Sequence, residues 1–217
     1  MKNLKLIFDF DSTILKLETI EILADFALKQ NKDKEKILNQ IKKLTDQAMN
    51  GKIDFSYALT KRISLLNITN ENIVKSTEFL RGKFSNSFKE NIENFNKKNC
   101  FIISGGFKEI IVPLMAPFGF KEENIYANNF KFKSNGYAEI NTDNDLSKNM
   151  GKNLAAKKIS GRKVAIGDGY TDYEVKKYND VEIFILFTEN IHRKKITNHA
   201  DYIAKNFKEV NNILKNV

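Results

Sequence analysis

The stretch KLIFDFDSTIL, residues 5–15, carries the strongest indication of the fold. Its apolar residues are typical of a buried strand, and they lead directly into two carboxylates, Asp9 and Asp11. Burying two like charges without partners would cost several kcal/mol. Either the strand ends here with both carboxylates in water, or a compensating group such as a metal ion lies beside them. The Asp-x-Asp pattern by itself leaves both interpretations open.

The composition indicates a globular protein in a reducing compartment. The chain has 217 residues, of which 41% are hydrophobic and 29% charged. Its single cysteine, Cys100, excludes an intrachain disulfide, and we therefore expect a cytoplasmic protein. No stretch approaches the roughly 20 apolar residues of a membrane span, so we expect no membrane association.

The net charge of +9 raises the question of nucleic-acid binding. The lysines are spread along the chain, and no dense basic block is interleaved with aromatic residues. Arginines are scarce, at positions 62, 81, 162 and 193. We expect a basic surface that attracts small anions and no nucleic-acid partner. The IHRKK run, residues 191–195, is interpreted as a solvated face.

The spacing of apolar residues divides the chain into two kinds of region. Spacings of three and four predict amphipathic helices over 18–30, 35–49, 55–66 and 72–80. A further helix is expected over 87–98. Strands then alternate with helices, at 100–103, 163–168, 182–187 and 202–204, with a hairpin over 124–140. This alternation predicts an α/β fold, a Rossmann-like doubly wound parallel sheet, with a small all-helical cap inserted after the first strand. We assign residues 1–15 and 84–217 to the core and residues 16–83 to the cap.

Three polar clusters follow predicted strands: Asp9 with Asp11, the segment 104–106 (Ser-Gly-Gly), and GDGYTD with Asp168 and Asp172. Ligands of open parallel sheets bind beyond the carboxyl ends of the strands. Turns after strands favour Asp, Ser and Gly for local reasons, so one cluster means little. Three clusters at one edge of the sheet predict a binding site.

The residue types in these clusters suit phosphoryl chemistry. Asp9, Asp11 and Asp168 offer the oxygen ligands that Mg²⁺ prefers. A carboxylate can attack phosphorus, and a second one can transfer the proton. Ser104 precedes a predicted helix N-terminus, which suits phosphate oxygens, and Lys152 can neutralise their charge. In a chain so rich in lysine, position alone favours a surface residue over a functional role for Lys152.

Five motifs in order resemble the haloacid dehalogenase superfamily of phosphatases, and most closely its phosphoserine phosphatase branch. They are DFDSTILKLE (9–18), MNGKIDFSYALTKRISLL (49–66), ISGGF (103–107), GK (151–152) and GDGYTDYE (167–174). The resemblance covers nearly the whole chain. It implies a Rossmann-like core, a helical cap, Mg²⁺ and hydrolysis of O-phospho-L-serine to L-serine and phosphate through an aspartyl-phosphate. Because the chain begins at its first strand, we expect no N-terminal regulatory domain of the kind that some relatives carry.

The resemblance also implies roles for individual residues. Asp9 resembles the nucleophile, and Asp11 the acid/base that also offers a backbone carbonyl to the metal. With them, Asp168 resembles the third metal ligand. The phosphate contacts would be Ser104, Gly105 and Lys152, with Asp172 and Thr13 in supporting positions.

Substrate selection is implied for Glu18, which would meet the ammonium group, and Arg62, which would meet the carboxylate. A zwitterionic substrate requires such a pair, an anion and a planar two-pronged donor. Alone, Glu18 would be interpreted as a helix-start residue and Arg62 as a solvated helix face. The remaining substrate positions would be Met49, Phe55, Gly106 and Thr171. Met49 and Phe55 fit the core of the cap equally well. Thr171 stands where many members have Asn, which leaves its contact open.

Two other functions remain compatible with the sequence. The first is a phosphatase or phosphotransferase of the same superfamily that acts on another small phosphomonoester. The second is a basic RNA-binding protein that keeps the fold without catalysis. The sequence leaves the oligomeric state open.

Overall fold

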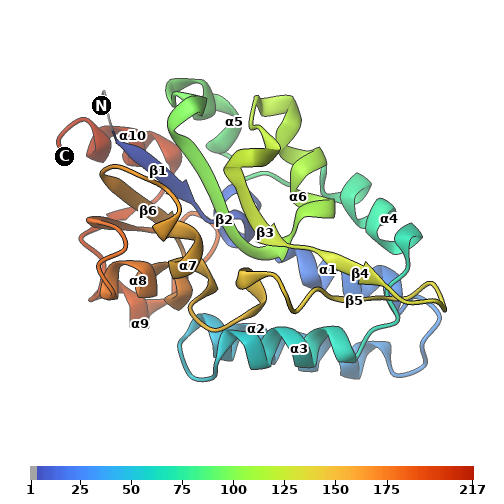
Figure 1. Ribbon diagram of the computed structural model, residues 1–217. Helices are drawn as coiled ribbons and strands as arrows, with labels where there is room; N and C mark the ends of the chain where they lie inside the picture. Colours follow the sequence, from blue (N-terminus) through green and yellow to red (C-terminus); the bar gives the residue numbers. More distant parts are fainter. Residues whose placement is uncertain (1–3) are drawn as a thin grey trace.

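A six-stranded parallel sheet forms the centre of the protein, whose structure is a computed structural model that describes residues 4–217. Residues 1–3 of the predicted core segment lie outside the described residues. The strand order is β3-β2-β1-β6-β7-β8, and Figure 1 shows β3, β2, β1 and β6 side by side. The strands are β1 (Lys5–Phe8), β2 (Cys100–Phe107), β3 (Ile125–Asn128), β6 (Lys163–Gly167), β7 (Ile183–Phe187) and β8 (Tyr202–Ala204). The predicted fold class is confirmed.

The position of β1 determines where a ligand can bind. Leu6 of β1 lies opposite Cys100 of β2 on one side and Val164 of β6 on the other. From β1 the chain builds the sheet outward through β2 and β3, and it then returns to add β6, β7 and β8 on the opposite side. The direction in which strands are added to the sheet therefore reverses between β1 and β6. Such a reversal opens a crevice at the carboxyl ends of the two strands.

Alternating side chains of the strands face two separate hydrophobic layers. Leu6 and Phe8 belong to the layer under α5 (Phe88–Asn91), α6 (Lys108–Met115) and α10 (Phe207–Leu214). Ile7 belongs to the layer under α7 (Gly151–Lys157), α8 (Tyr170–Lys177) and α9 (Lys194–Thr197). Successive strand residues point to opposite faces, so the continuous apolar run of β1 is what a sheet covered on both sides requires.

The four predicted amphipathic helices come between β1 and β2 in the sequence, and the last of them packs beside α6 of the core (Figure 1). They are α1 (Thr19–Ala27), α2 (Lys34–Met49), α3 (Phe55–Ser64) and α4 (Asn70–Leu80). Leu15 and Phe84 pair in an antiparallel bridge, so the chain leaves the core and returns to it side by side. This bridge supports the boundaries 16 and 83, which stay a prediction.

Two predictions of local structure hold only for part of their length. The hairpin expected over 124–140 contains only β4 (Phe130–Phe132) and β5 (Ala138–Ile140), because β3 pairs with β2 in the main sheet. The helix expected over 87–98 is limited to α5, followed by 3₁₀ turns over Ile92–Asn94 and Lys97–Asn99. In this segment the Asn96 side chain accepts from the Lys98 N–H, a local bond that competes with helix formation.

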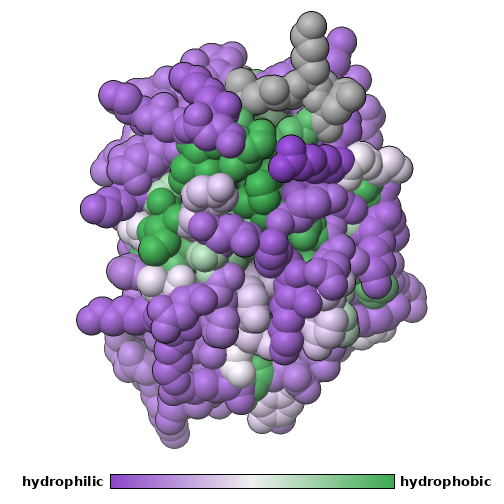
Figure 2. Space-filling model, turned by 90° about the vertical axis from the view of Figure 1, so that its left-hand side faces the viewer, coloured by the Kyte–Doolittle hydropathy of each residue, from purple (hydrophilic) through white to green (hydrophobic). Residues whose placement is uncertain are grey.

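Among residues 4–217, no helix combines the length and apolar character that crossing a membrane requires. Hydrophilic side chains cover most of the face shown in Figure 2, and a smaller apolar area interrupts them. The edge strand β8 exposes Tyr202 and Ile203, yet it is only three residues long, which limits pairing with another chain.

Phe207 should be a main determinant of stability. It is fully buried and packs against the rings of Phe8, Phe88 and Phe187. Phe207→Ala should lower the free energy of unfolding by about 3–5 kcal/mol, measured by urea denaturation, because it removes apolar contacts and leaves a cavity. The control is Phe132→Ala, at a half-exposed position, for which we expect a loss below about 1 kcal/mol. Equal losses in the two variants would contradict this description of the core.

Candidate active site

One pocket, between the carboxyl edge of the sheet and the cap, collects most of the predicted site residues. Asp9 directly follows β1 and Asp168 directly follows β6, so they lie on either side of the crevice between these strands. Eleven of the predicted residues line the pocket, namely Asp9, Asp11, Glu18, Met49, Phe55, Arg62, Ser104, Gly105, Gly106, Lys152 and Asp168. Segments far apart in sequence therefore meet where the polar clusters predicted a site.

Lys152 lies between two buried carboxylates. Its Nζ is 2.8 Å from Asp9 Oδ1 and 2.7 Å from Asp172 Oδ1. Burial alone would lower the pKa of the Lys152 ammonium, but the charges of Asp172 and Asp9 outweigh burial and raise this pKa. Asp172 also accepts the N–H of Gly169, at 3.1 Å, which fixes it at the start of α8. Lys152 is therefore a buried cation of the site, not a surface lysine.

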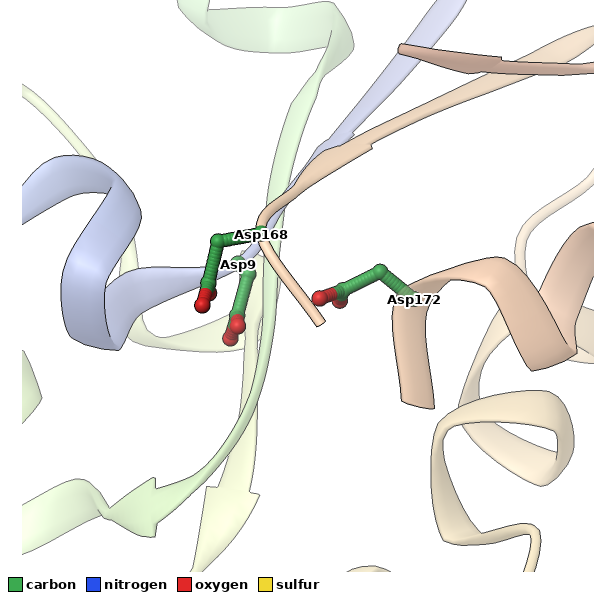
Figure 3. Close-up of side chains that lie close together, drawn as sticks. All are labelled: Asp9, Asp168 and Asp172. Atoms are coloured by element: carbon green, nitrogen blue, oxygen red, sulfur yellow. The ribbon is translucent and has the colours of Figure 1, made fainter. Parts of the chain in front are cut away.

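Three carboxylates point toward one another at the centre of the site (Figure 3). Asp9, Asp168 and Asp172 each offer one oxygen, and these oxygens lie within 4.8 Å of one another. This group differs from the predicted metal set of Asp9, Asp11 and Asp168. The Asp11 carboxylate instead accepts from Thr19, at 2.9 Å from its N–H and 3.0 Å from its hydroxyl. The predicted contact of the Asp11 backbone carbonyl with a metal stays a prediction.

The charges of the site do not balance among the protein groups alone. Five acidic side chains lie together, Asp9, Asp11, Glu18, Asp168 and Asp172, and residues 4–217 place three cations among them, Lys152, Arg62 and Arg193. Burial raises the pKa of Asp11 to about 8, with a further contribution from Glu18, and it raises that of Asp168 to about 7. The carboxylates would therefore hold protons unless a further positive charge is present. A divalent cation with oxygen ligands fits this donor set, in which the described residues place no His or Cys.

The structure contradicts the interpretation of Arg193 as part of a solvated face. Its side chain is 4% exposed, and its Nε donates to Asp168 Oδ2 at 2.8 Å. Its other nitrogens lie 3.8 Å from Glu18 Oε1 and 3.4 Å from Asp46 Oδ1. Although the two lysines that follow it in the sequence are exposed, Arg193 is drawn into the interior by buried carboxylates. The scarcity of arginine is the one feature of the sequence that could have identified Arg193. Two of the four arginines in this lysine-rich chain, Arg62 and Arg193, lie at the site.

Arg62 is held in place by the cap itself. The side chain is buried, with Nη1 donating to Thr45 Oγ1 at 2.9 Å and Nε donating to the carbonyl of Ala58 at 3.2 Å. Its guanidinium lies 5.8 Å from the centre of the Phe55 ring. Burial lowers the Arg62 pKa, and the nearby charge of Glu18 opposes this shift. Arg62 is thus an oriented donor in the pocket wall, and Thr45, which sequence reasoning missed, orients it.

The Ser-Gly-Gly segment near the end of β2 lies in close contact with Phe55 of the cap. Ser104 Oγ accepts from the N–H of Gly106 at 2.9 Å, and the carbonyl of Gly105 accepts from Asn128 at 2.9 Å. A Cβ on Gly105 would lie only 2.3 Å from Cζ of Phe55. Because Phe55 belongs to α3, glycine is required here for the cap to rest on the core. Met49 contacts the core in the same way, since a Cβ on Gly169 would lie 2.9 Å from its sulfur.

Three predicted residues lie outside the pocket lining: Asp172, which binds Lys152, and Thr171 and Thr13. Thr171 is buried and lines two neighbouring cavities. Thr13 is fully buried beneath the first connection to the cap. Neither hydroxyl has a hydrogen-bond partner among residues 4–217. The geometry therefore gives no direct support for a substrate contact from Thr171.

The chain is similar to known proteins over almost its whole length. No protein-family model matches the chain. The phosphoserine phosphatase of Bos taurus is 28% identical over 211 residues, which cover 94% of this chain and 89% of that protein. The chloroplastic phosphoserine phosphatase of Arabidopsis thaliana is 29% identical over 215 residues, 95% of this chain and 70% of that protein. Among solved structures, a phosphoserine phosphohydrolase-like protein from Francisella tularensis is 30% identical, with a TM-score of 0.88, over 97% of this chain and 99% of that one.

The Lys152 ion pairs should be needed for folding as well as for the site. Lys152→Met, without divalent cations, should lower the free energy of unfolding by about 3–5 kcal/mol, because it leaves Asp9 and Asp172 buried without their cation. Lys157→Met, on the exposed side of the same helix, is the matched control and should stay within about 1 kcal/mol of the unmodified protein. Urea denaturation measures both. A Lys152→Met variant as stable as the control would show that the carboxylates are neutralised by other means.

Proposed function

Because this chain belongs to the phosphoserine phosphatase branch of the haloacid dehalogenase superfamily, we propose that it hydrolyses O-phospho-L-serine to L-serine and phosphate. The observation that carries the proposal is the placement of Glu18 and Arg62 in the same pocket as Asp9. Glu18 offers a carboxylate to an ammonium group, and Arg62 offers a planar donor to a carboxylate. The single buried cysteine supports a cytoplasmic location.

Mg²⁺ is the proposed cation. When bound, it would offset the charges of the phosphate oxygens and the surrounding carboxylates. Asp9 and Asp168 would hold it through side-chain oxygens and Asp11 through its carbonyl. Asp172 is already held by Lys152 and Gly169, so we assign it to fixing Lys152 beside Asp9.

Asp9 is the proposed nucleophile. One of its carboxylate oxygens forms a bond to phosphorus as the bond from phosphorus to the serine oxygen breaks, which leaves an aspartyl-phosphate. Asp11 donates the proton that the leaving alkoxide needs. The fixed orientation of the Asp11 carboxylate on Thr19 supports this role, and burial, which raises the pKa of Asp11, favours the protonated form that donates. In the second step Asp11 takes a proton from the attacking water, and phosphate leaves Asp9.

The transferring phosphoryl group would lie against the end of β2. Ser104 and the N–H of Gly105 would contact its oxygens. Lys152 lies 2.8 Å from Asp9 and would offset the negative charge that approaches this residue. Phe55 and Met49, which cover the site from the cap, would exclude water from it.

A panel of small phosphomonoesters tests the proposed function. With purified protein and Mg²⁺, phosphoserine should give the highest kcat/KM. Preference for an ester that lacks both the amine and the carboxylate would move the assignment to another phosphatase of the superfamily. No phosphate release from any ester would favour a non-catalytic binding protein.

Asp9→Asn should remove the nucleophile while it retains the shape of the side chain. We expect kcat to fall by about three orders of magnitude or more, measured as phosphate release. Asp25→Asn, at an exposed position on the cap, serves as the control and should leave kcat unchanged. Near-normal turnover by Asp9→Asn would exclude the proposed role.

Activity should require Mg²⁺ and be inhibited by Ca²⁺. Ca²⁺ takes more ligands at longer distances and accepts bidentate carboxylates, which would turn Asp9 away from in-line attack. The measurement is phosphate release after chelation and after addition of each cation. Full activity in the presence of excess chelator would contradict the metal assignment.

Substitution of the two selecting residues should affect one class of substrate. Arg62→Lys keeps the charge but loses the two-pronged donor, so kcat/KM for phosphoserine should fall about ten- to a hundredfold. Glu18→Gln should also lower kcat/KM for phosphoserine. Neither variant should much affect p-nitrophenyl phosphate, which has neither amine nor carboxylate. Equal losses on both substrates would indicate that these residues support the structure and do not select the substrate.

A further inference from the structure

The segment between β7 and α9 fastens both connections of the cap to the core. The amide of Asn190 donates to the carbonyls of Ser12, at 3.0 Å, and Leu15, at 3.3 Å, on the outgoing connection. It also donates to the hydroxyl of Ser85, at 2.6 Å, on the returning connection. The backbone of this segment is therefore fixed relative to the base of the cap.

Arg193 ends the same segment and contacts three carboxylates on three different elements. Asp168 follows β6 of the core, Glu18 precedes α1, and Asp46 lies on α2 in the cap. The distances are 2.8, 3.8 and 3.4 Å, and each involves a different nitrogen of the guanidinium. Arg193 is 4% exposed, whereas Asp46 is 53% exposed. One buried side chain thus joins a metal-site carboxylate to the surface of the cap.

We propose that Arg193 is a positioning residue that orients the Asp168 carboxylate for the divalent cation and, through Asp46, holds the cap closed. This inference rests on the proposed function. The Arg193 Nε engages one oxygen of Asp168, which limits rotation of the carboxylate in a site where its direction matters. The planar guanidinium reaches three acids at once from fixed directions, which the single ammonium of a lysine cannot do.

The contacts make cation binding and cap closure favour each other. Moving α2 away from the core would separate Asp46 from Arg193 and free the guanidinium to turn from Asp168. Conversely, a cation that fixes Asp168 leaves Arg193 in the position that Asp46 contacts. Coupling between two equilibria is reciprocal, so a change at Asp46 should alter the affinity for Mg²⁺ even without substrate.

The first experiment measures KM and kcat for phosphoserine in Asp46→Asn. We expect KM to rise about two- to fivefold with kcat little changed, the size of effect that a partly exposed ion pair can have. Glu35→Gln removes one negative charge from the exposed first turn of the same helix and should leave both constants unchanged. In an Arg193→Lys background, Asp46→Asn should have no further effect.

The second experiment titrates Mg²⁺ into the substrate-free protein by isothermal calorimetry. Arg193→Lys keeps the positive charge, so the change in affinity reports orientation, and we expect a roughly tenfold weaker Kd. Asp46→Asn should weaken it about twofold, since the coupling is reciprocal. Glu35→Gln should match the unmodified protein. Melting curves confirm that each variant is folded, and if Arg193→Lys is not, the comparison of Asp46→Asn with Glu35→Gln carries the test.

Two results would overturn the proposal: an unchanged Mg²⁺ affinity in folded Arg193→Lys, or identical behaviour of Asp46→Asn and Glu35→Gln. Either would leave the proposed function intact. Absence of phosphoserine turnover by the unmodified protein would instead contradict the proposed function, and the calorimetric comparison would still decide the role of Arg193.

Discussion

Five acidic side chains lie together in one largely buried site, and the arrangement of the surrounding structure follows from the need to offset their charge. Lys152 lies between Asp9 and Asp172 at hydrogen-bond distance from both, and Arg193 binds Asp168. These cations leave an excess of negative charge, which burial makes costly. The proposed divalent cation would complete the balance. The stability of the folded protein thus depends on cations beside these carboxylates. The same carboxylates would carry out the proposed phosphoryl transfer.

The fold brings these charges together because the order in which strands are added to the parallel sheet reverses between β1 and β6. Asp9 and Asp168 leave neighbouring parallel strands at this point, and Lys152 and Asp172 come from the two helices beside them. The cap inserted after β1 then covers the opening. Close contacts of Phe55 and Met49 with Gly105 and Gly169 depend on the absence of side chains at these glycines. The core would thus supply the reaction and the cap the choice of substrate.

Much of this could be predicted from the sequence, since periodicity placed the cap helices, and the strand-end clusters located the site at Asp9, Ser104 and Asp168. Residues that act through tertiary contacts could not be predicted. Thr19 and Thr45 orient Asp11 and Arg62 through hydrogen bonds that no spacing rule reveals. The burial of Arg193 depends on carboxylates distant in the sequence. Local patterns describe periodic elements well, whereas ion pairs between distant segments require the assembled fold.

The central claim is that Asp9 is the residue that accepts the phosphoryl group, and acid quenching during turnover tests it most directly. The protein would be mixed with phosphoserine and Mg²⁺, quenched in acid within milliseconds, digested, and mapped by mass spectrometry. The account predicts an acid-stable, base-labile phosphoryl group on Asp9 that disappears as substrate is exhausted. A phosphoryl group on Ser12, Thr13 or Asp11 instead would contradict it.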